Sequence, residues 1–279
     1  MSETYFPNLP SADMALEREL RRITSALPEL ARYELYGVYT RAQSRCVPTE
    51  FIIEDNFVAA RQAGETVWFP RPLPMVKYGH VSCGYREWLR RKYTLPGFVS
   101  VEPGDIVIDC GAYVGGFTLG ASEIAAQVHA FEPEDCNFEA LRRNTESLPN
   151  VSINHMGLYN RAGAAQFNIS ASSVEHSMLQ PDDGEAIAVV EIPLVTVGGY
   201  LRGKGITRLD FLKLEAEGVE LEIFEGLEGF RPRKLAIDVS AERENESPAG
   251  RFIELLGRLG YETQRRGHVL FARLDGVPA

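Results

Sequence analysis

The chain has 279 residues, of which 44% are hydrophobic and 24% are charged, values that are ordinary for a globular protein. Its formal net charge of −10 argues against a nucleic-acid partner, because phosphate binding needs a basic surface. The four cysteines and five histidines show no metal-ligand spacing, and no apolar run reaches transmembrane length. Acids at Asp13, Glu17 and Glu19 stand where a signal peptide would be apolar. We therefore expect a cytoplasmic protein that binds neither nucleic acid nor membrane.

Residues 1–95 differ in pattern from the rest of the chain. Helices are predicted at 14–26, 29–42 and 84–93, and extended chain at 51–53 and through the proline-rich stretch 68–75. This region carries many apolar side chains that an α/β core would not need. We expect it to form a separate helical and extended region that covers a ligand crevice or builds a homodimer contact.

Residues 96–279 alternate strands and helices, which is typical of a parallel α/β sheet. Strands are predicted at 106–108, 128–131, 151–155, 164–169, 186–195, 209–214 and 234–239, with a closing hairpin of 261–265 and 268–273. Helices are predicted at 116–125, 134–148, 197–202, 219–226 and 249–259. The pattern predicts a doubly wound α/β sheet of about seven strands, and such sheets bind ligands beyond the carboxyl ends of their strands.

A glycine turn follows the first of these strands, in the sequence Asp-Cys-Gly-Ala-Tyr-Val-Gly of residues 109–115. Glycines let the backbone approach a ligand closely. Glu132 lies 21 positions after Gly111, near the offset of about 20 at which an acid meets a ribose. The spacing does not match the Gly-x-Gly-x-x-Gly fingerprint of NAD. S-adenosylmethionine has no phosphate and favours acids near its ammonium group and ribose. The turn therefore favours S-adenosylmethionine over NAD, and over a turn without a ligand.

A second cluster of charged residues follows the strand at 209–214. Lys213 and three acids, Glu215, Glu217 and Glu220, crowd around Gly218. Acids this close repel one another unless a positive charge compensates them. That charge is either a cation of the cosubstrate or the combination of a helix N-terminus with Lys213, and the sequence leaves both open.

Together, the segments 107–115, 130–133 and 211–220 resemble the FkbM-type family of S-adenosylmethionine-dependent methyltransferases, over residues 85–273. In this family the last segment usually has the sequence Lys-Ile-Asp-Val-Glu-Gly-Ala-Glu. Here Leu214, Glu215, Ala216 and Val219 replace its Ile, Asp, Val and Ala. The resemblance implies a class I methyltransferase fold with an N-terminal extension, and O-methylation of a hydroxyl on a small natural product or a sugar.

The turn and the resemblance together suggest which residues bind the cosubstrate. We expect these to be Asp109, Gly111, Ala112, Tyr113, Gly115, Glu132, Pro133, Met156 and Gly157. Methyl transfer also requires a group that removes the acceptor's proton. The catalytic candidates are His176, whose type titrates near neutral pH, with Lys213, Glu215 and Glu217; Asp238 is a further candidate base.

No metal is expected, because two carboxylates are a weak case for an octahedral site. Three alternative functions stay open. They are another S-adenosylmethionine-using transferase or cyclase, a non-catalytic cofactor-binding protein of the same fold, and an NAD-dependent dehydrogenase.

Overall fold

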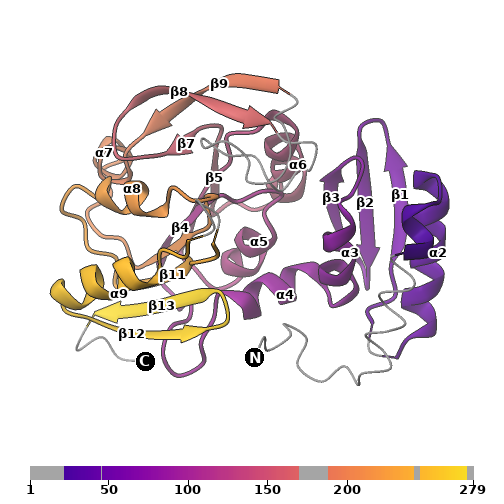
Figure 1. Ribbon diagram of the computed structural model, residues 1–279, viewed down its shortest axis with the longest axis horizontal. Helices are drawn as coiled ribbons and strands as arrows, with labels where there is room; N and C mark the ends of the chain where they lie inside the picture. The colour runs from indigo at the N-terminus through magenta and orange to yellow at the C-terminus, as the bar shows by residue number, and fades with distance from the viewer. Residues whose placement is uncertain (1–21, 45, 170–187, 242–245, 275–279) are drawn as a thin grey trace. The chain divides into compact units, whose positions relative to one another are not determined.

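The computed structural model describes residues 22–44, 46–169, 188–241 and 246–274 of the chain. The chain forms two compact units, Met1–Trp88 and Leu89–Ala279, which Figure 1 draws in one view. Our sequence-based boundary lies at 95/96 instead, just after helix α4 (Tyr85–Lys92), which begins in the first unit and ends in the second. None of the described helices is long and apolar enough to cross a membrane.

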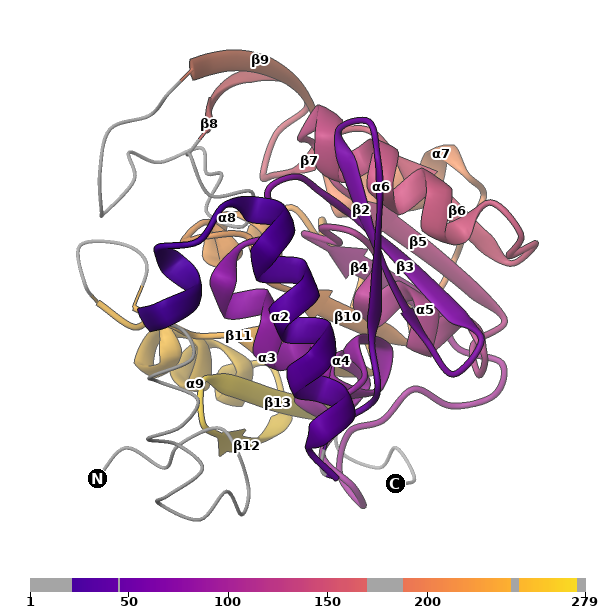
Figure 2. The same ribbon diagram turned by 90° about the vertical axis from the view of Figure 1, so that its right-hand side faces the viewer.

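The first unit combines a small antiparallel sheet with two helices. Its elements are α2 (Glu29–Ala42), β1 (Glu50–Glu54), β2 (Phe57–Gln62), β3 (Glu65–Pro70) and α3 (Met75–Ser82). The three strands pair in chain order, and β2 and β3 run side by side in Figure 2. Helix α2 packs beside β1 (Figure 1). The expected helix at 29–42 is present, whereas β2 and α3 were not predicted.

Aromatic side chains fill the core of this unit. Tyr33 and Tyr36 lie one turn apart on α2, and each is 3% exposed. Their ring centroids lie 6.1 and 4.1 Å from that of Tyr78, and Phe51 from β1 stacks on Tyr33 at 5.3 Å. These residues account for much of the apolar surface that the sequence required this region to bury.

The second unit is built on a seven-stranded sheet with the order β12-β13-β11-β10-β4-β5-β6. The strands are β4 (Ile106–Cys110), β5 (Gln127–Phe131), β6 (Val151–Asn154), β10 (Phe211–Leu214), β11 (Lys234–Asp238), β12 (Tyr261–Arg266) and β13 (Val269–Leu274). Strands β11, β10, β4, β5 and β6 run parallel, and β13 pairs antiparallel with β11 and β12. The expected doubly wound sheet of about seven strands is confirmed.

Helices cover both faces of this sheet (Figure 1). They are α5 (Gly116–Ser122), α6 (Asp135–Thr145), α7 (Val197–Gly203), α8 (Glu220–Glu225) and α9 (Ala249–Arg258). The last three pack on one face, where Leu201, Ile223 and Phe252 join the main hydrophobic core. On the other face, Leu141 of α6 packs against Ala112 and Ala130.

A second, smaller sheet follows β6 and was not predicted as a separate layer. Its order is β7-β9-β8, formed by β7 (Gly157–Leu158), β8 (Gly163–Ile169) and β9 (Ala188–Val195). Thr196 follows β9 and caps α7, since its side chain accepts a hydrogen bond from the Gly199 backbone N–H at 2.9 Å.

Two central strands share a pattern in which charged residues bracket an apolar run. Asp105 and Asp109 flank the run in β4, and Lys234 and Asp238 bracket the one in β11. The run in β11 is fully buried, and in β4 only Ile106 is partly exposed, as expected for parallel strands covered on both faces. The charged residues therefore collect at the two ends of the sheet, which we call its amino end and its carboxyl end.

Candidate functional site

The glycine turn leaves β4 at the carboxyl end of the sheet, where the strand order reverses between β4 and β10. Gly111 has φ +69° and Gly115 has φ +88°, in the left-handed region that glycine tolerates best. A Cβ on Gly111 would lie 1.8 Å from the carbonyl oxygen of Glu215, and one on Gly115 would lie 2.7 Å from Leu141 Cδ1. Doubly wound sheets bind ligands at such a reversal, and the two glycines let the turn pack closely against the Glu215 backbone and Leu141 there.

A buried ion pair supports the turn from inside the protein. The Asp109 side chain is fully buried, and its Oδ2 accepts a hydrogen bond of 2.6 Å from the Thr118 hydroxyl. Its Oδ1 lies 3.1 Å from Lys213 Nζ, although no donor among the described residues makes a well-aligned hydrogen bond to that oxygen. Lys213 also donates to the carbonyl oxygens of Cys110 and Gly111, at 3.0 and 2.6 Å. Lys213 thereby fixes the backbone at the start of the turn.

Glu132, at the end of β5, joins the turn to the neighbouring strand. Its Oε2 accepts a hydrogen bond of 2.8 Å from the Tyr113 N–H, and its Oε1 accepts one of 3.1 Å from the Glu134 N–H. Burial raises the pKa of Glu132 to about 7, against the lowering effect of these two backbone bonds. The acid expected to meet a ribose thus lies directly beside the turn.

Glu215 lies between two lysines. Its Oε2 is 3.3 Å from Lys213 Nζ, and its Oε1 is 2.5 Å from Nζ of Lys92, the last residue of α4. Lys92 Nζ is also 2.9 Å from Asp238 Oδ2 at the end of β11. Lys92 was missed in the sequence, because α4 carries several other basic residues and nothing in its spacing marks this one as buried.

The remaining acids of the late cluster point to different partners. Glu220 turns inward, and its Oε1 accepts hydrogen bonds from the N–H groups of Ala216 and Gly218, at 2.7 and 3.4 Å. Burial raises the pKa of Glu220 to about 7. Glu217 and Gly218 have φ +52° and +94°, so the loop itself is held in an uncommon conformation. The acids avoid mutual repulsion through two lysines and the loop's own backbone.

The third strand end, after β6, carries the predicted residues Met156 and Gly157. Gly157 packs against Leu194: a Cβ added to Gly157 would lie 2.8 Å from Leu194 Cδ2. Gly157 is thus packed within the small sheet, and Met156 precedes it, half-buried. His155 Nε2 lies 3.1 Å from Asp135 Oδ1. His176 lies outside the described residues.

Metal ligands do not gather at this site. Within the described ranges, no group of three or more His, Cys, Asp or Glu side chains has the arrangement of a metal centre. The acids of the carboxyl end lie instead against lysines or backbone N–H groups.

A family model of the methyltransferase FkbM domain matches residues 109–263, more than half of the chain. The chain belongs to the FkbM methyltransferase family. This match confirms the resemblance seen in the glycine turn and the late acidic segment. The protein is a methyltransferase whose methyl donor is S-adenosylmethionine. The dehydrogenase alternative falls away.

Two methyltransferases extend the comparison. The chain is 26% identical to 31-O-demethyl-FK506 methyltransferase FkbM of Streptomyces tacrolimicus, over 69% of this chain and 88% of the relative. It is 27% identical to methyltransferase sdnD of Sordaria araneosa, over 44% of this chain and 60% of the relative.

Solved methyltransferases show a more distant likeness. The crystal structure of methyltransferase FkbM from Methylobacillus flagellatus KT is 17% identical, with a TM-score of 0.44, over 71% of this chain and 53% of that one. Magnesium protoporphyrin IX methyltransferase from Synechocystis PCC 6803, solved with bound S-adenosylmethionine, is 14% identical, with a TM-score of 0.41, over 72% and 81%.

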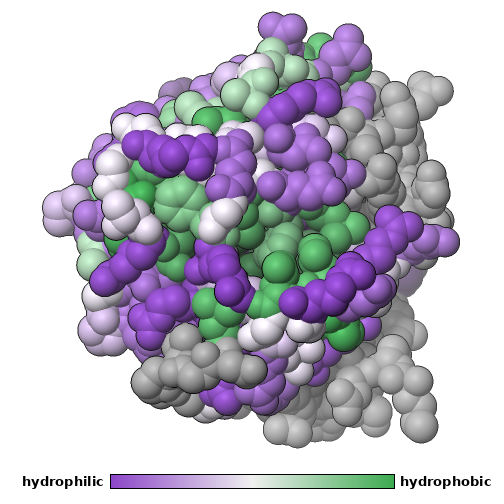
Figure 3. All heavy atoms as spheres, turned by 90° about the vertical axis from the view of Figure 1, so that its left-hand side faces the viewer, coloured by the Kyte–Doolittle hydropathy of each residue, from purple (hydrophilic) through white to green (hydrophobic). Residues whose placement is uncertain are grey.

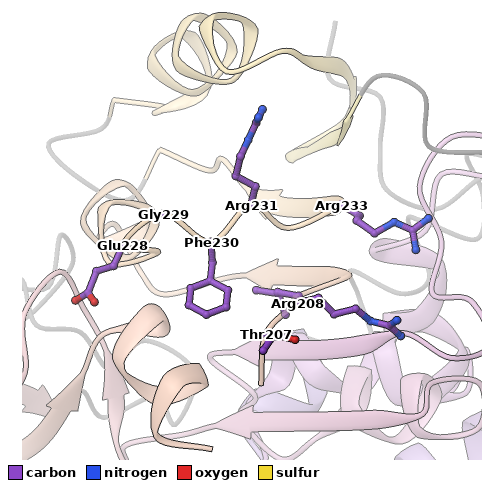
Figure 4. Close-up of a pocket in the computed structure, with 8 residues that line it drawn as sticks. Thr207, Arg208, Glu228, Gly229, Phe230, Arg231 and Arg233 are labelled. Atoms are coloured by element: carbon purple, nitrogen blue, oxygen red, sulfur yellow. The ribbon is translucent and has the colours of Figure 1, made fainter. Parts of the chain in front are cut away.

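A separate pocket of about 430 Å³ lies at the amino end of the sheet, on the far side from the glycine turn. Phe230 points into it, while Arg208 and Arg233 extend to one side and Arg231 points away (Figure 4). Arg208 and Arg233 are ion-paired with Asp210, and Arg231 donates to the Leu259 carbonyl oxygen. These arginines already bind protein oxygens, and we therefore assign the chemistry to the carboxyl end.

The face that carries α7, α8 and α9 shows hydrophobic side chains gathered near its middle, between hydrophilic ones (Figure 3). Ile253 and Leu259, in and directly after α9, are 44% and 39% exposed.

Proposed function

We propose that this FkbM-family methyltransferase O-methylates a hydroxyl on a small natural product or a sugar. The observation that carries the proposal is the position of Glu215. Its side chain is 29% exposed, whereas those of Asp109, Lys213 and Asp238, which belong to the same chain of ion pairs, are 0%, 2% and 5% exposed. Glu215 is the carboxylate of this group that an acceptor hydroxyl can best reach.

The glycine turn and Glu132 suit the cosubstrate. Gly111 and Gly115 let the turn pack closely against the Glu215 backbone and Leu141 where the strand order reverses, and Glu132 presents a carboxylate at the ribose offset. When bound, S-adenosylmethionine supplies a methyl group whose bond to sulfur breaks as a bond to the acceptor oxygen forms, leaving the electron pair on sulfur. The proposed cosubstrate-binding set is completed by Asp109, Ala112, Tyr113, Pro133, Met156 and Gly157.

Glu215 has the geometry of a group that orients the acceptor. Two lysine ammonium groups stabilise its carboxylate, so it stays ionised and is a weak base. It can still accept a hydrogen bond from the acceptor hydroxyl and hold the oxygen in line. The hydroxyl proton becomes strongly acidic only as the new bond to carbon forms, and at that stage a weak base is sufficient to receive it. Glu217 and His176 stay proposed participants.

The experiment is a turnover assay with S-adenosylmethionine and a panel of hydroxylated compounds. The compound named by the first relative, 31-O-demethyl-FK506, is the first probe, followed by other polyketides and by sugars. Mass spectrometry should show an acceptor heavier by one methylene together with S-adenosylhomocysteine. Methylation at nitrogen or carbon would contradict the O-methyl proposal, and a cosubstrate product other than S-adenosylhomocysteine would point to a different transfer.

Paired variants test the role of Glu215 once an acceptor is found. Glu215→Gln should lower kcat by about 100-fold, the lower part of the range for losing a positioned acid–base group. Glu254→Gln is the control, because Glu254 lies exposed on α9 in a pair with Arg258. Equal activities in the two variants would remove Glu215 from the mechanism.

We also propose that the protein forms a homodimer through α2. Leu30 and Val38 are 56% and 54% exposed on this helix and lie toward one side of it. Light scattering of the wild type and of Leu30→Glu tests this. A dimer that the substitution converts to a monomer is expected, and a wild-type monomer would contradict it.

A further inference from the structure

Lys92 is a second buried lysine at the carboxyl end of the sheet, and its role is not evident from the sequence. Its side chain is 12% exposed and its ammonium group bridges Glu215 and Asp238. Burial by itself would lower the pKa of Lys92, but the two carboxylates outweigh this and raise the pKa above its ordinary value. Lys92 is therefore positively charged at neutral pH.

Lys92 completes a continuous chain of five charged groups. In order, each within ion-pair distance of the next, they are Asp109, Lys213, Glu215, Lys92 and Asp238. They come from the ends of three adjacent strands, β4, β10 and β11, and from the end of α4. With three carboxylates and two ammonium groups, the chain carries a net charge of −1.

This ionic chain contacts the glycine turn directly. Lys213 donates to the carbonyl oxygens of Cys110 and Gly111, and the Glu215 backbone lies against Gly111, where a Cβ would be 1.8 Å away. Its charge is therefore felt where the cosubstrate is expected to bind. The low polarisability of a buried site makes such a charge more effective than it would be in water.

We propose that Lys92 is a positioning residue of the methyl-transfer site, which holds Glu215 and Asp238 side by side as carboxylates and limits the net charge of the ionic chain to −1. The inference rests on the proposed function and deepens it. S-adenosylmethionine, with a sulfonium, an ammonium and a carboxylate, carries a net charge of +1, which the ionic chain balances. S-adenosylhomocysteine lacks the sulfonium charge and is neutral.

The balance predicts how the protein discriminates cosubstrate from product. Without Lys92, the net charge of the ionic chain would change from −1 to −2, and the site would hold the sulfonium form too tightly relative to the neutral product. Because methyl transfer discharges the sulfonium, such an excess would stabilise the ground state more than the transition state. Lys92 therefore limits the negative electrostatic potential at the sulfonium of the methyl donor. It also holds Glu215, the carboxylate proposed to contact the acceptor, in position.

The test compares affinities for S-adenosylmethionine and S-adenosylhomocysteine by isothermal titration at pH 8. In Lys92→Met, the ratio of the product Kd to the cosubstrate Kd should rise about tenfold, as expected for one added charge near the sulfonium at an intermediate dielectric constant. In Lys92→Arg, which keeps the charge, the ratio should stay within about twofold of the wild type. A folded Lys92→Met protein with an unchanged ratio would overturn the proposal.

Lys234→Met is the matched control. Lys234 is also buried, with 3% of its side chain exposed, and also bridges two acids, Glu102 and Asp105, at 2.6 and 2.7 Å. It stands at the other end of the neighbouring strand β11, so its loss should leave the ratio unchanged. If the ratio of the two Kd values rose equally in Lys92→Met and Lys234→Met, the change would reflect a general structural disturbance. That result would overturn the specific role of Lys92.

Asp238→Asn keeps the proposal testable if Lys92→Met does not fold. It removes one negative charge from the same group, so the ratio should fall, opposite in sign to the effect of Lys92→Met. An unchanged ratio would count against the proposal. None of these measurements uses an acceptor, so a failed search for the acceptor and a failed role for Lys92 are distinguished.

Discussion

The two ends of the central sheet use the same residue types for different purposes. At the amino end, Lys234 bridges Glu102 and Asp105. The neighbouring Asp210 accepts a hydrogen bond from the Ile106 N–H at 2.9 Å and is ion-paired with two arginines. Each buried charge there has an opposite charge beside it, as a structural network requires.

The carboxyl end is less completely compensated. Glu132 and Glu220 are buried acids whose first partners are backbone N–H groups, and burial raises the pKa of each to about 7. The glycines differ as well. A Cβ on Gly111 would collide with the Glu215 carbonyl oxygen, whereas one on Gly104, in the turn before β4, would meet nothing within 4 Å.

We take this difference in charge compensation to distinguish charged residues that stabilise the fold from charged residues that take part in ligand binding. A buried lysine between two acids occurs at both ends, so this motif alone does not identify a functional site. Acids that stay buried with raised pKa values, beside a crowded glycine turn, are the distinguishing feature. Four substitutions or titrations test this distinction, in order of expected effect.

The largest effect is expected from Lys234→Met, and only on stability. The substitution leaves the carboxylate of Asp105, 2% exposed, without its lysine. Loss of one partner of a buried ion pair should lower the free energy of unfolding by about 3–5 kcal/mol, measured by urea denaturation. The Kd for S-adenosylhomocysteine, extrapolated to the folded fraction, should not change. A weakened Kd would show that the two ends of the sheet are not independent.

Gly111→Ala should abolish cosubstrate binding. The added Cβ requires both a left-handed backbone and the space occupied by the Glu215 carbonyl oxygen, so the turn must move. We expect the Kd for S-adenosylhomocysteine to rise at least about 100-fold, which corresponds to roughly 2.7 kcal/mol. Gly104→Ala is the control, because it has φ +89° and so the same backbone strain without the collision. Similar losses in both variants would mean that strain alone explains the effect.

The sequence predicted the strands of the second unit well, because their buried apolar runs and flanking turns are local features. It also placed the glycine turn, Glu132 and the late acids at one end of the sheet, since parallel strands bring their carboxyl ends together. The predicted hairpin of 261–265 and 268–273 leaves Arg266 and Gly267 as its turn. In the structure β12 ends at Arg266 and β13 begins at Val269, so the turn lies one residue later, at Gly267 and His268.

Other features depended on contacts that no local pattern encodes. The role of Lys92 requires α4 to meet the ends of β10 and β11, more than 100 positions later in the chain. The small sheet arises because β7 pairs with β9 rather than extending β6. In the first unit, β2 and α3 carry mixed patterns that a short window does not resolve.

Glu132→Ala should weaken the binding of S-adenosylhomocysteine by about 1.5–3 kcal/mol, the range for a hydrogen bond to a charged group. The loss combines the contact with the ribose and the support that Glu132 gives to the Tyr113 N–H. Glu102→Ala, at the amino end, is the control for removing an acid from the sheet. Isothermal titration provides the measurement, and a Glu132→Ala protein with wild-type affinity would exclude Glu132 from the cosubstrate site.

The smallest effect is a pH dependence of cosubstrate binding. Glu132 must be ionised to accept hydrogen bonds from ribose hydroxyls, and its pKa of about 7 is raised from the usual 4.5. Its carboxylate is mostly formed at pH 8 and mostly protonated at pH 6, so the affinity for S-adenosylhomocysteine should fall about tenfold between these values. The same titration affects the stability of the ligand-free protein. Because the pKa of Glu132 is raised, the folded state binds its proton more tightly than the unfolded state does. The contribution of Glu132 to the free energy of unfolding therefore falls as pH rises from 4.5 to 7.

Two variants separate this effect from other titrations. Glu132→Gln cannot ionise, so its affinity for S-adenosylhomocysteine should be the same at pH 6 and pH 8. Glu220→Gln should keep the wild-type dependence, because Glu220 also has a pKa of about 7 but faces the backbone of its own loop. A dependence that persists in Glu132→Gln and disappears in Glu220→Gln would transfer the titration to the late loop. Glu220 would then control cosubstrate binding by holding the backbone that packs against Gly111, and the ribose contact would have to come from another residue of the carboxyl end.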